Sequence, residues 1–276
     1  MYHKIVSDSS SDIKELSGVP YESVPLKIIT DEKEYVDDKD VDVVEMLSDL
    51  KKYSGRSRSS CPNSEEYMRA FSDAKNIFVV TITSNLSGSY NSAVIAAKAY
   101  MNQFPDRNVH IIDSLSTGPE CALIIEKLRS LMVENYEFED VKQKITEYHE
   151  HTRLLFALEN MHNLANNGRV SPIVAKMAGL LGIRAIGRAS DQGTLEMICK
   201  SRGPHNAALD ILKNMIDEGY NGGKCKIHHA NNLPAAELLW SMITEKFPDA
   251  KVDVSMTGAL CSFYAEQGGI LVGFEV

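Results

Sequence analysis

The stretch VVTITSNLSGSYNSAVIAAKAY at residues 79–100 indicates the fold class most directly. An apolar run typical of a buried strand leads into a loop of Ser, Asn and Gly, and a helical pattern begins near Ser87 or Gly88. The first turn of a helix offers free N–H groups and a partial positive charge, and Ser84, Ser87 and Ser89 add hydroxyls. The stretch predicts a loop that binds an anionic group, although a Ser87 that only caps its helix fits the same residues.

The same order of strand, loop and helix recurs along the first half of the chain. Strands are expected at residues 4–8, 24–30, 77–83 and 109–113, and helices at 41–52, 64–74, 88–101 and 119–134. Such alternation is typical of a parallel sheet with helices on both faces. Ligands of these sheets gather beyond the carboxyl ends of the strands, where the loops SDSSSD, TSNLSGS and DSLSTG all fall. We expect these three polar loops to meet at one edge of the sheet.

The second half of the chain predicts a second sheet. After a helical segment at 139–151, apolar runs are found at 153–158, 183–186, 194–199, 225–228, 252–255 and 270–274, with helical patterns at 206–218 and 234–246. A length of 276 residues fits one large or two medium domains. We therefore predict an α/β protein with two α/β domains, residues 1–152 with a mainly parallel sheet and residues 153–276.

Composition and charge exclude several classes of protein. Hydrophobic residues make up 43% of the chain and charged residues 24%, which is ordinary for a folded protein and excludes intrinsic disorder. Asp and Glu (38) outnumber Lys and Arg (29), and the basic residues are scattered, so no nucleic acid is expected as a partner. Apolar runs are too short to span a membrane, and acidic residues stand where a signal peptide would be apolar. We expect a cytoplasmic protein without membrane insertion, whose five widely spaced cysteines are reduced thiols.

The segment RSSCPN at residues 58–63 carries two adjacent hydroxyls, on Ser59 and Ser60. The proline that follows keeps this segment extended, so both hydroxyls are candidates to face a ligand. A plain loop ahead of a helix, with Asn63 or Ser64 as its cap, is the alternative interpretation.

The segment HNLANNGRVS at residues 162–171 ends a helical pattern in NNG. A left-handed conformation at Asn167 or Gly168 would end the helix and direct Arg169 inward. An inward Arg is costly unless it meets an anion, so Arg169 is a candidate anion-binding residue. A surface Arg that follows a helix cap is the alternative.

Signatures of familiar enzyme classes, among them GxSxG, GxxxxGK[ST], HExxH and GxGxxG, do not occur in the sequence. His228 and His229 are neighbours in an expected strand and would face opposite ways, so we interpret them as structural histidines and predict no metal site. An enzyme that acts on a small phosphorylated or carboxylated substrate remains the alternative function. Its serine nucleophile would need a general base, for which Asp8 and Asp113 are the candidates.

Together the loops resemble those of the DegV family of bacterial fatty-acid-binding proteins, which includes the acyl-binding subunits of fatty acid kinase. The resemblance rests on SDSSSDI (7–13), VPLKI (24–28), SSCP (59–62), LSGSYNSA (86–93), IIDSLSTGPE (111–120) and NNGRVS (166–171). Relatives often show TSQP in place of SSCP and GGRIS within the last motif. The order and spacing of these motifs over nearly the whole chain make the resemblance specific.

The resemblance implies a long-chain fatty acid, such as palmitate or oleate, as the ligand and no cofactor. The acyl chain would occupy an apolar tunnel between sheet and helices, and the protein would serve lipid transport without catalysis. The residues that the resemblance assigns to the carboxylate are Ser59 or Ser60, Ser87, the amides of Gly88 and Ser89, and Arg169 as the charge partner behind them.

Kinase-associated relatives also use an exposed Arg and a His near the C-terminus when the acyl phosphate forms. Arg202 matches the Arg, but the chain has YAEQGG at residues 264–269 where these relatives carry HTGxGA. Tyr264 thus takes the position of the His, and Glu266 that of a Gly. The resemblance implies a possible fatty acid kinase as partner, and the substitution at Tyr264 predicts weak phosphotransfer with it.

Overall fold

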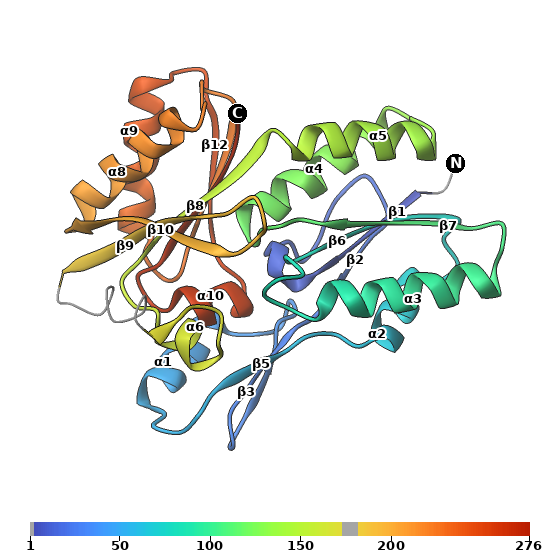
Figure 1. Ribbon diagram of the computed structural model, residues 1–276, viewed down its shortest axis with the longest axis horizontal. Coiled ribbons are helices and arrows are strands. Elements are labelled where there is room, and N and C mark those ends of the chain that lie inside the picture. The colour runs from blue at the N-terminus through green and yellow to red at the C-terminus, as the bar shows by residue number, and fades with distance from the viewer. Residues whose placement is uncertain (1–2, 173–181) are drawn as a thin grey trace.

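A four-stranded parallel sheet organises the first half of the chain, in a computed structural model that describes residues 3–172 and 182–276 (Figure 1). In spatial order its strands are β2 (Tyr21–Val24), β1 (His3–Asp8), β6 (Asn76–Thr81) and β7 (Asn108–Asp113). Every residue of the two central strands, β1 and β6, is buried, because helices cover both faces of the sheet. The parallel sheet predicted from the alternating pattern is confirmed.

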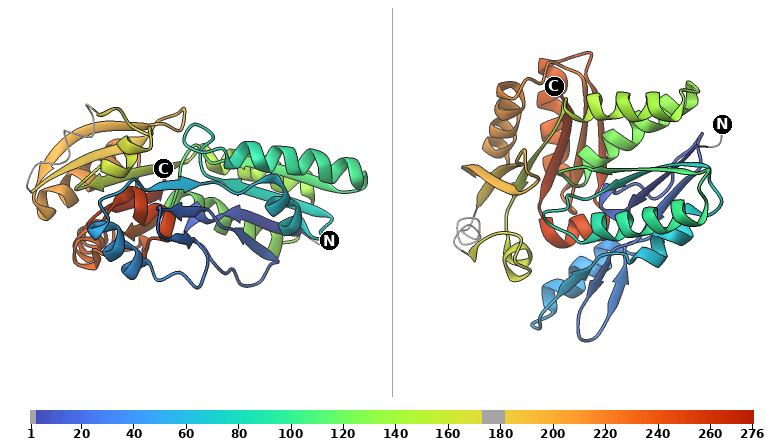
Figure 2. Two further views of the ribbon diagram at one scale, coloured as in Figure 1. Left: turned by 90° about the horizontal axis from the view of Figure 1, so that it is seen from below. Right: turned by 45° about the vertical axis from the view of Figure 1, so that its right-hand side comes forward.

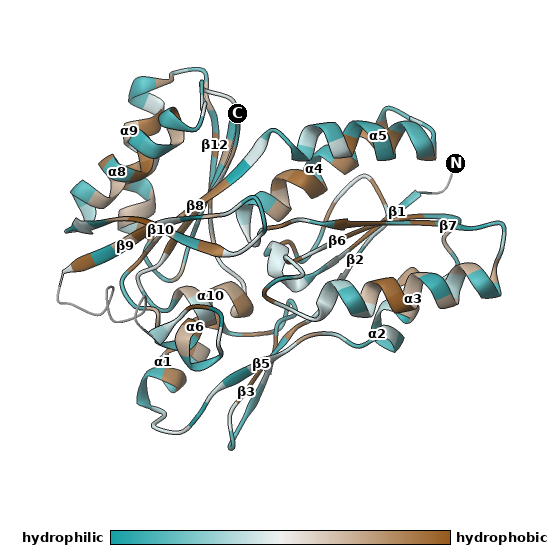
Figure 3. Ribbon diagram, viewed as in Figure 1, coloured by the Kyte–Doolittle hydropathy of each residue, from teal (hydrophilic) through white to brown (hydrophobic). Residues whose placement is uncertain are grey.

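Two pairs of helices cover the faces of this sheet, α2 (Ser64–Phe71) with α3 (Ser89–Gln103), and α4 (Pro119–Val133) with α5 (Phe138–His149) (Figure 1). Successive residues of β6 point to opposite faces, so Ile77 packs on the first pair and Phe78 on the second. Helix α4 is the most enclosed of the four and is brown in its middle in Figure 3. The expected helices therefore occur, with ends that differ by a few residues.

The second half forms a six-stranded mixed sheet, as the second series of apolar runs predicts. In spatial order its strands are β10 (Leu195–Arg202), β9 (Ile183–Ala189), β8 (Thr152–Leu158), β13 (Ile270–Glu275), β11 (Lys224–His229) and β12 (Lys251–Met256). Only β11 and β12 pair in parallel. Helices α8 (Pro204–Asp217) and α9 (Leu233–Lys246) pack on one face, and the short helices α6 (His162–Asn166) and α10 (Ala259–Ala265) lie on the other (Figure 2).

A third sheet of three short antiparallel strands was not predicted. It consists of β4 (Glu34–Val36), β3 (Lys27–Ile29) and β5 (Arg58–Ser60), and it lies beside α1 (Val43–Lys52) (Figure 1). The expectation of one strand at residues 24–30 is wrong, because the chain leaves β2 at Val24 and begins β3 only at Lys27. Strands of three residues are too short to show a period of two.

Helix α10 was also not predicted, and it includes Tyr264. Six of its seven residues are buried, so it lacks the one-sided pattern that marks a surface helix. Its first turn is capped from far away in the sequence, because the carboxylate of Asp37 accepts the N–H of Ala259 at 2.8 Å and that of Leu260 at 3.1 Å. Lys14 Nζ donates to the same carboxylate at 2.6 Å.

Buried polar contacts join the two halves of the chain. His228 Nδ1 lies 2.7 Å from Asp12 Oδ2, and Asp12 Oδ1 accepts the N–H of Gly258 at 2.7 Å. Lys226 of β11 forms a salt bridge of 2.6 Å with Glu126 of α4. His228 therefore has a structural role, as expected. The two main sheets divide the chain between β7 and β8, and the domain boundary near residue 152 stays a prediction.

Candidate ligand-binding pocket

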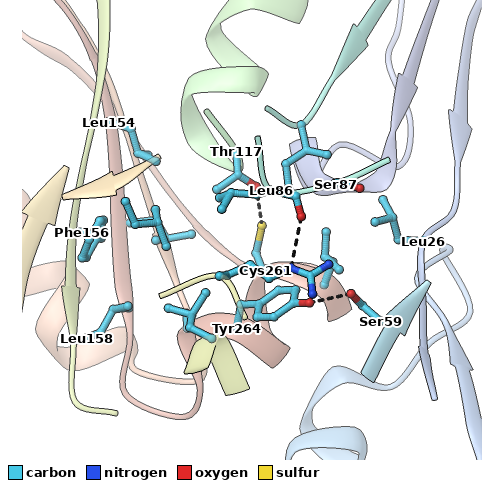
Figure 4. A pocket seen from close by; sticks show the side chains of 17 residues that line it. Leu26, Ser59, Leu86, Ser87, Thr117, Leu154, Phe156, Leu158, Cys261 and Tyr264 are labelled. Carbon is cyan, nitrogen blue, oxygen red and sulfur yellow. Dashed lines mark hydrogen bonds between the residues drawn. The ribbon is translucent and has the colours of Figure 1, made fainter. Parts of the chain in front are cut away.

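A narrow apolar pocket lies where the loops of the parallel sheet meet the inner face of the mixed sheet (Figure 4). The empty space between its lining atoms, part of which is open to solvent, is about 660 Å³, and little of it is wide enough for a water molecule to move freely. A slot of this kind suits a thin, flexible chain better than a bulky ring. Its apolar lining residues are Leu26, Ile82, Leu86, Leu154, Phe156, Leu158, Leu164, Leu195, Leu260, Cys261, Ala265 and Leu271.

Polar side chains gather on one side of this pocket. Ser59 and Tyr264 share a hydrogen bond of 2.6 Å between their hydroxyl oxygens, and the guanidinium of Arg169 lies 5.8 Å from the centre of the Tyr264 ring. Figure 4 shows Ser59 and Ser87 on this side and Leu154 and Phe156 on the opposite one. The pocket is therefore amphipathic along its length, with hydroxyls and a cation at one end.

Arg169 reaches the pocket because of the chain reversal that the NNG motif predicts. Gly168 adopts a positive φ of 75°, which a glycine tolerates without strain, and the Arg169 N–H donates to the Leu164 carbonyl at 2.8 Å. The guanidinium donates to the carbonyl oxygens of Leu86, at 3.2 Å, and of Asn167. Within the described residues no carboxylate forms a salt bridge with Arg169, so its charge is available to an anion in the pocket.

Ser59 and Ser60 face opposite ways because both lie in strand β5. Ser59 lines the pocket, whereas Ser60 is exposed and its hydroxyl donates to the Cys61 carbonyl at 3.4 Å. Only the first of the two predicted hydroxyls is in place to contact a ligand there. A strand of three residues gave no pattern from which this choice could be made.

The start of helix α3 differs in detail from the expectation. Gly88 is the N-cap residue, and Ser87 Oγ accepts the N–H of Ser89 at 3.2 Å while Ser87 also lines the pocket. The Ser89 hydroxyl turns away and donates to Asp8 Oδ2 at 2.6 Å, so it is part of the core and does not face the pocket. Among the described residues the Gly88 N–H has no hydrogen-bond acceptor, and Gly88 lies next to Ser87 but does not itself line the pocket.

Asp8 and Asp113, the candidate bases, hold the loops in place. Asp8 is buried and also accepts the Ile82 N–H at 3.0 Å and the Ser10 hydroxyl at 2.5 Å. Burial raises the pKa of Asp8, and these hydrogen bonds oppose that shift. Asp113 accepts the Ser84 N–H at 3.0 Å. Neither carboxylate lines the pocket, but both help the three polar loops to meet at one edge of the sheet, as predicted.

Tyr264 is brought into the pocket by α10. Burial raises the pKa of Tyr264, whereas the Ser59 hydrogen bond and the charge of Arg169 oppose this rise. The phenol is therefore protonated at neutral pH and able to donate a hydrogen bond. Arg202, its expected companion, is exposed at the end of β10 and does not line this pocket.

Glu266, the other residue that departs from the family pattern, follows α10 with a positive φ of 53°. Its carboxylate accepts the Asn163 N–H at 3.1 Å and lines a separate polar cavity outside the apolar pocket. Burial raises the pKa of Glu266. The backbone conformation at position 266 is therefore one that favours glycine and strains a glutamate. The hydrogen bond to Asn163 offsets part of this strain.

Sequence reasoning missed several residues that shape the pocket. Leu154, Phe156 and Leu158 are alternate residues of β8 that line the pocket, but the sequence is apolar at every position from 154 to 158, so no period of two indicates which face is the inner one. Thr117 and Cys261 meet inside the pocket, with 3.5 Å between Oγ1 and Sγ, and no local pattern links residues so distant in the sequence. None of the helices within residues 3–172 and 182–276 is long and apolar enough to cross a membrane.

Comparison with known proteins identifies the family. The family model described as an uncharacterised protein family, DegV, matches residues 3–275. The chain belongs to the DegV family. A DegV domain-containing protein of Streptococcus pneumoniae is 41% identical over 280 residues, which span 100% of both chains. The membership in the DegV family that the loop motifs predict is thus confirmed.

Two solved structures are very similar to this DegV protein. A DegV family protein from Eubacterium eligens, loaded with heptadecanoic acid, superposes with a TM-score of 0.97 at 43% identity and covers 99% of each chain. The fatty acid kinase (Fak) B3 protein of Streptococcus pneumoniae, loaded with linoleic acid, gives a TM-score of 0.98 at 41% identity over 100% of each chain. The α/β fold expected from the sequence is that of these fatty-acid-loaded proteins.

Proposed function

We propose that this DegV protein binds one long-chain fatty acid, with the acyl chain in the narrow pocket and the carboxylate at the polar end. The observation that carries this proposal is the distribution of chemistry along the pocket, apolar over most of its lining and polar on one side. Burial of a methylene contributes about 0.8 kcal/mol, so a chain with about fourteen of them gains about 11 kcal/mol before the cost of ordering it. That gain is sufficient for tight binding.

In this proposal Ser59, Ser87 and Arg169 hold the carboxylate, together with the free N–H of Gly88. Both serines and the arginine line the pocket, and the hydroxyl of Tyr264 is within hydrogen-bond distance of Ser59. A carboxylate accepts up to about four hydrogen bonds, which these donors can supply. Ser60 and the Ser89 hydroxyl have no part in this binding site.

The two fatty-acid-loaded relatives support the choice of ligand. Both bind chains of the expected type, and both are more than 40% identical to this chain over essentially its full length. Their ligands differ, one saturated and one polyunsaturated. We therefore infer a long-chain fatty acid as the ligand without assigning its degree of unsaturation.

We propose further that the protein is a carrier without catalytic activity of its own. A serine nucleophile needs a neighbouring base. In the described residues Ser59 is bonded to the Tyr264 hydroxyl and Ser87 to a backbone N–H. Asp8 accepts the Ser89 hydroxyl and Asp113 accepts the Ser84 N–H, so neither carboxylate is placed to act as a general base for Ser59 or Ser87.

The likeness to the Streptococcus pneumoniae fatty acid kinase (Fak) B3 protein supports a fatty acid kinase as the partner. In that partnership the protein would present the fatty-acid carboxylate for phosphorylation. We place it in the cytoplasm, because its five cysteines are free thiols and three of them are buried in the core.

Isothermal titration calorimetry of delipidated protein tests the proposed function. Palmitate and oleate are expected to bind one per chain, while hexadecanol, which lacks the carboxylate, and decanoate, which has fewer methylenes, bind much more weakly. Absence of heat and of any rise in thermal stability with palmitate and with oleate would contradict the proposal.

A further inference from the structure

Phe156 lies in the apolar wall of the pocket, opposite the polar end. It is the middle one of three alternate residues of β8, and all three line the pocket. Figure 4 shows Leu154, Phe156 and Leu158 on the side away from Ser59 and Ser87. Phe156 is 1% exposed and is the largest apolar side chain of the lining. A chain that enters with its carboxylate at the polar end would direct its tail toward this ring.

Gly187 of β9 lies directly across from Phe156 in the antiparallel pair of β8 and β9. A Cβ atom at position 187 would lie 2.3 Å from Phe156 Cζ and 2.6 Å from Cε2, much closer than the contact distance of about 3.5 to 4.0 Å. The ring thus occupies the space that any other side chain at 187 would need. Gly187 is not among the residues with positive φ, so the requirement for glycine comes from packing and not from backbone conformation.

We propose that Phe156, packed against Gly187, sets the length of acyl chain that the pocket accepts. This inference rests on the proposed function and concerns the specificity of the same pocket. Phe156 is the specificity-determining residue, and Gly187 is a positioning residue that lets the ring lie back on β9. The Glu196 carbonyl oxygen would lie 2.4 Å from the same Cβ atom, so the neighbouring strand β10 also closes this space.

Affinities for palmitate, stearate and arachidate, each two methylenes longer than the last, test the proposal in wild type, Phe156→Leu and Phe156→Ala. The measured quantity is the ratio of the palmitate Kd to the arachidate Kd, because a general loss of stability affects both ligands alike. Each methylene that gains a buried place changes Kd roughly fourfold. We expect the ratio to rise roughly tenfold or more in Phe156→Ala and by less in Phe156→Leu.

Phe274→Leu is the matched control, because Phe274 is a fully buried phenylalanine that packs on the opposite face of the same sheet. It should lower stability without changing the ratio. Gly187→Ala should shift the ratio in the opposite direction, since a methyl group there pushes the ring into the pocket. If Gly187→Ala does not fold because of the Glu196 carbonyl, the two Phe156 variants decide the question.

Equal ratios in wild type, Phe156→Leu and Phe156→Ala would overturn the assignment of Phe156. Failure of the proposed function would look different, because wild-type protein would then bind none of the three fatty acids. The two failures are thus separated before any variant is compared.

Discussion

Arg169 is the one positively charged side chain among the described residues that line the pocket. Its hydrogen bonds to the Leu86 and Asn167 carbonyls fix the direction of the guanidinium, and within the described part of the chain no carboxylate forms a salt bridge with it. A cation in a partly desolvated place is costly until an anion pairs with it. This position therefore favours a carboxylate ligand over a neutral lipid.

Replacement of Arg169 by alanine is expected to weaken palmitate binding by about 2 to 5 kcal/mol, because the carboxylate would lose its charge partner in a desolvated site. Arg169→Lys should recover part of that loss, since it keeps the charge but not the planar fork. Calorimetry measures the affinity, and a thermal melt of each delipidated variant controls for folding. Unchanged affinity in Arg169→Ala would remove Arg169 from the binding site.

Tyr264 stands where kinase-associated relatives carry a histidine. We therefore expect the protein to bind fatty acid normally but to support little acyl-phosphate formation with a bacterial fatty acid kinase and ATP. A histidine near neutral pH can carry positive charge toward a phosphate, whereas the pKa of Tyr264 is raised and its hydroxyl stays neutral. Tyr264→His should raise the rate, and adding Glu266→Gly should relax the strained backbone that follows. If the unmodified protein supported acyl-phosphate formation at the same rate as a His-bearing relative, Tyr264 would not lower that rate and this prediction would be wrong.

At the scale of single elements, α10 depends on a residue from the other half of the chain. Asp37 is fully buried, caps the first turn of α10 and pairs with Lys14, whose side chain is 21% exposed. Asp37→Ala should lower the free energy of unfolding by about 3 kcal/mol, because it leaves two N–H groups without an acceptor and Lys14 with only the carbonyl of residue 37. It should also weaken fatty-acid binding, since α10 carries Tyr264 and Cys261 into the pocket.

Chemical denaturation and palmitate titration of the same preparation check this expectation. Asp38→Ala is a suitable control, because Asp38 lies next in the chain, and within the described residues its side chain accepts a hydrogen bond only from the Asp40 N–H. Similar losses in both variants would mean that the cap on α10 has no special role.

The elements that the sequence predicts well are those whose signals are local. The buried strand at Asn76–Thr81 shows in the sequence as an apolar run and the helix that follows it as a helical pattern, and the NNG motif predicts the chain reversal before Arg169. Helix α10 could not be predicted, because its cap comes from Asp37 and its burial is nearly complete. The choice between Ser59 and Ser60 likewise depended on the register of β5 against β3, which tertiary structure sets.

The candidate site was predictable only in part for the same reason. Ser59, Ser87 and Arg169 stand in motifs that the family resemblance assigns to the carboxylate, and all three line the pocket. The amide of Ser89, which the resemblance also assigns to the carboxylate, donates to Ser87 Oγ, and the Ser89 hydroxyl is taken by Asp8, a residue about eighty positions earlier. Sequence patterns indicate the candidate residues, whereas packing between distant segments determines which of their side chains line the pocket.

At the scale of the whole molecule, the pocket is built from both halves of the chain, and the ligand therefore bridges them. Leu26, Ile82 and Leu86 come from the first half, and Leu154, Phe156 and Leu271 from the second. Buried contacts such as that between Asp12 and His228 join the same halves without a ligand. A fatty acid that binds only the folded state adds to this stability by mass action.

Removal of the ligand is therefore expected to lower the Tm. At a free palmitate concentration of about 100 times Kd, binding contributes about 2.7 kcal/mol, which corresponds to about 5 °C for a chain of this size. Differential scanning calorimetry of delipidated protein, with and without palmitate, measures the shift, and hexadecanol serves as the control. An identical Tm with and without palmitate would argue that the pocket in the folded protein stays empty.

Native mass spectrometry of the protein purified from a bacterial host tests the central claim most directly. A narrow apolar pocket in contact with cell lipids should retain a ligand through purification, so we predict a mass above that of the bare chain by one long-chain fatty acid. Organic extraction of the same sample should then release that fatty acid at about one per chain. A spectrum of bare chains alone, from protein that also takes up no added palmitate or oleate, would contradict the account.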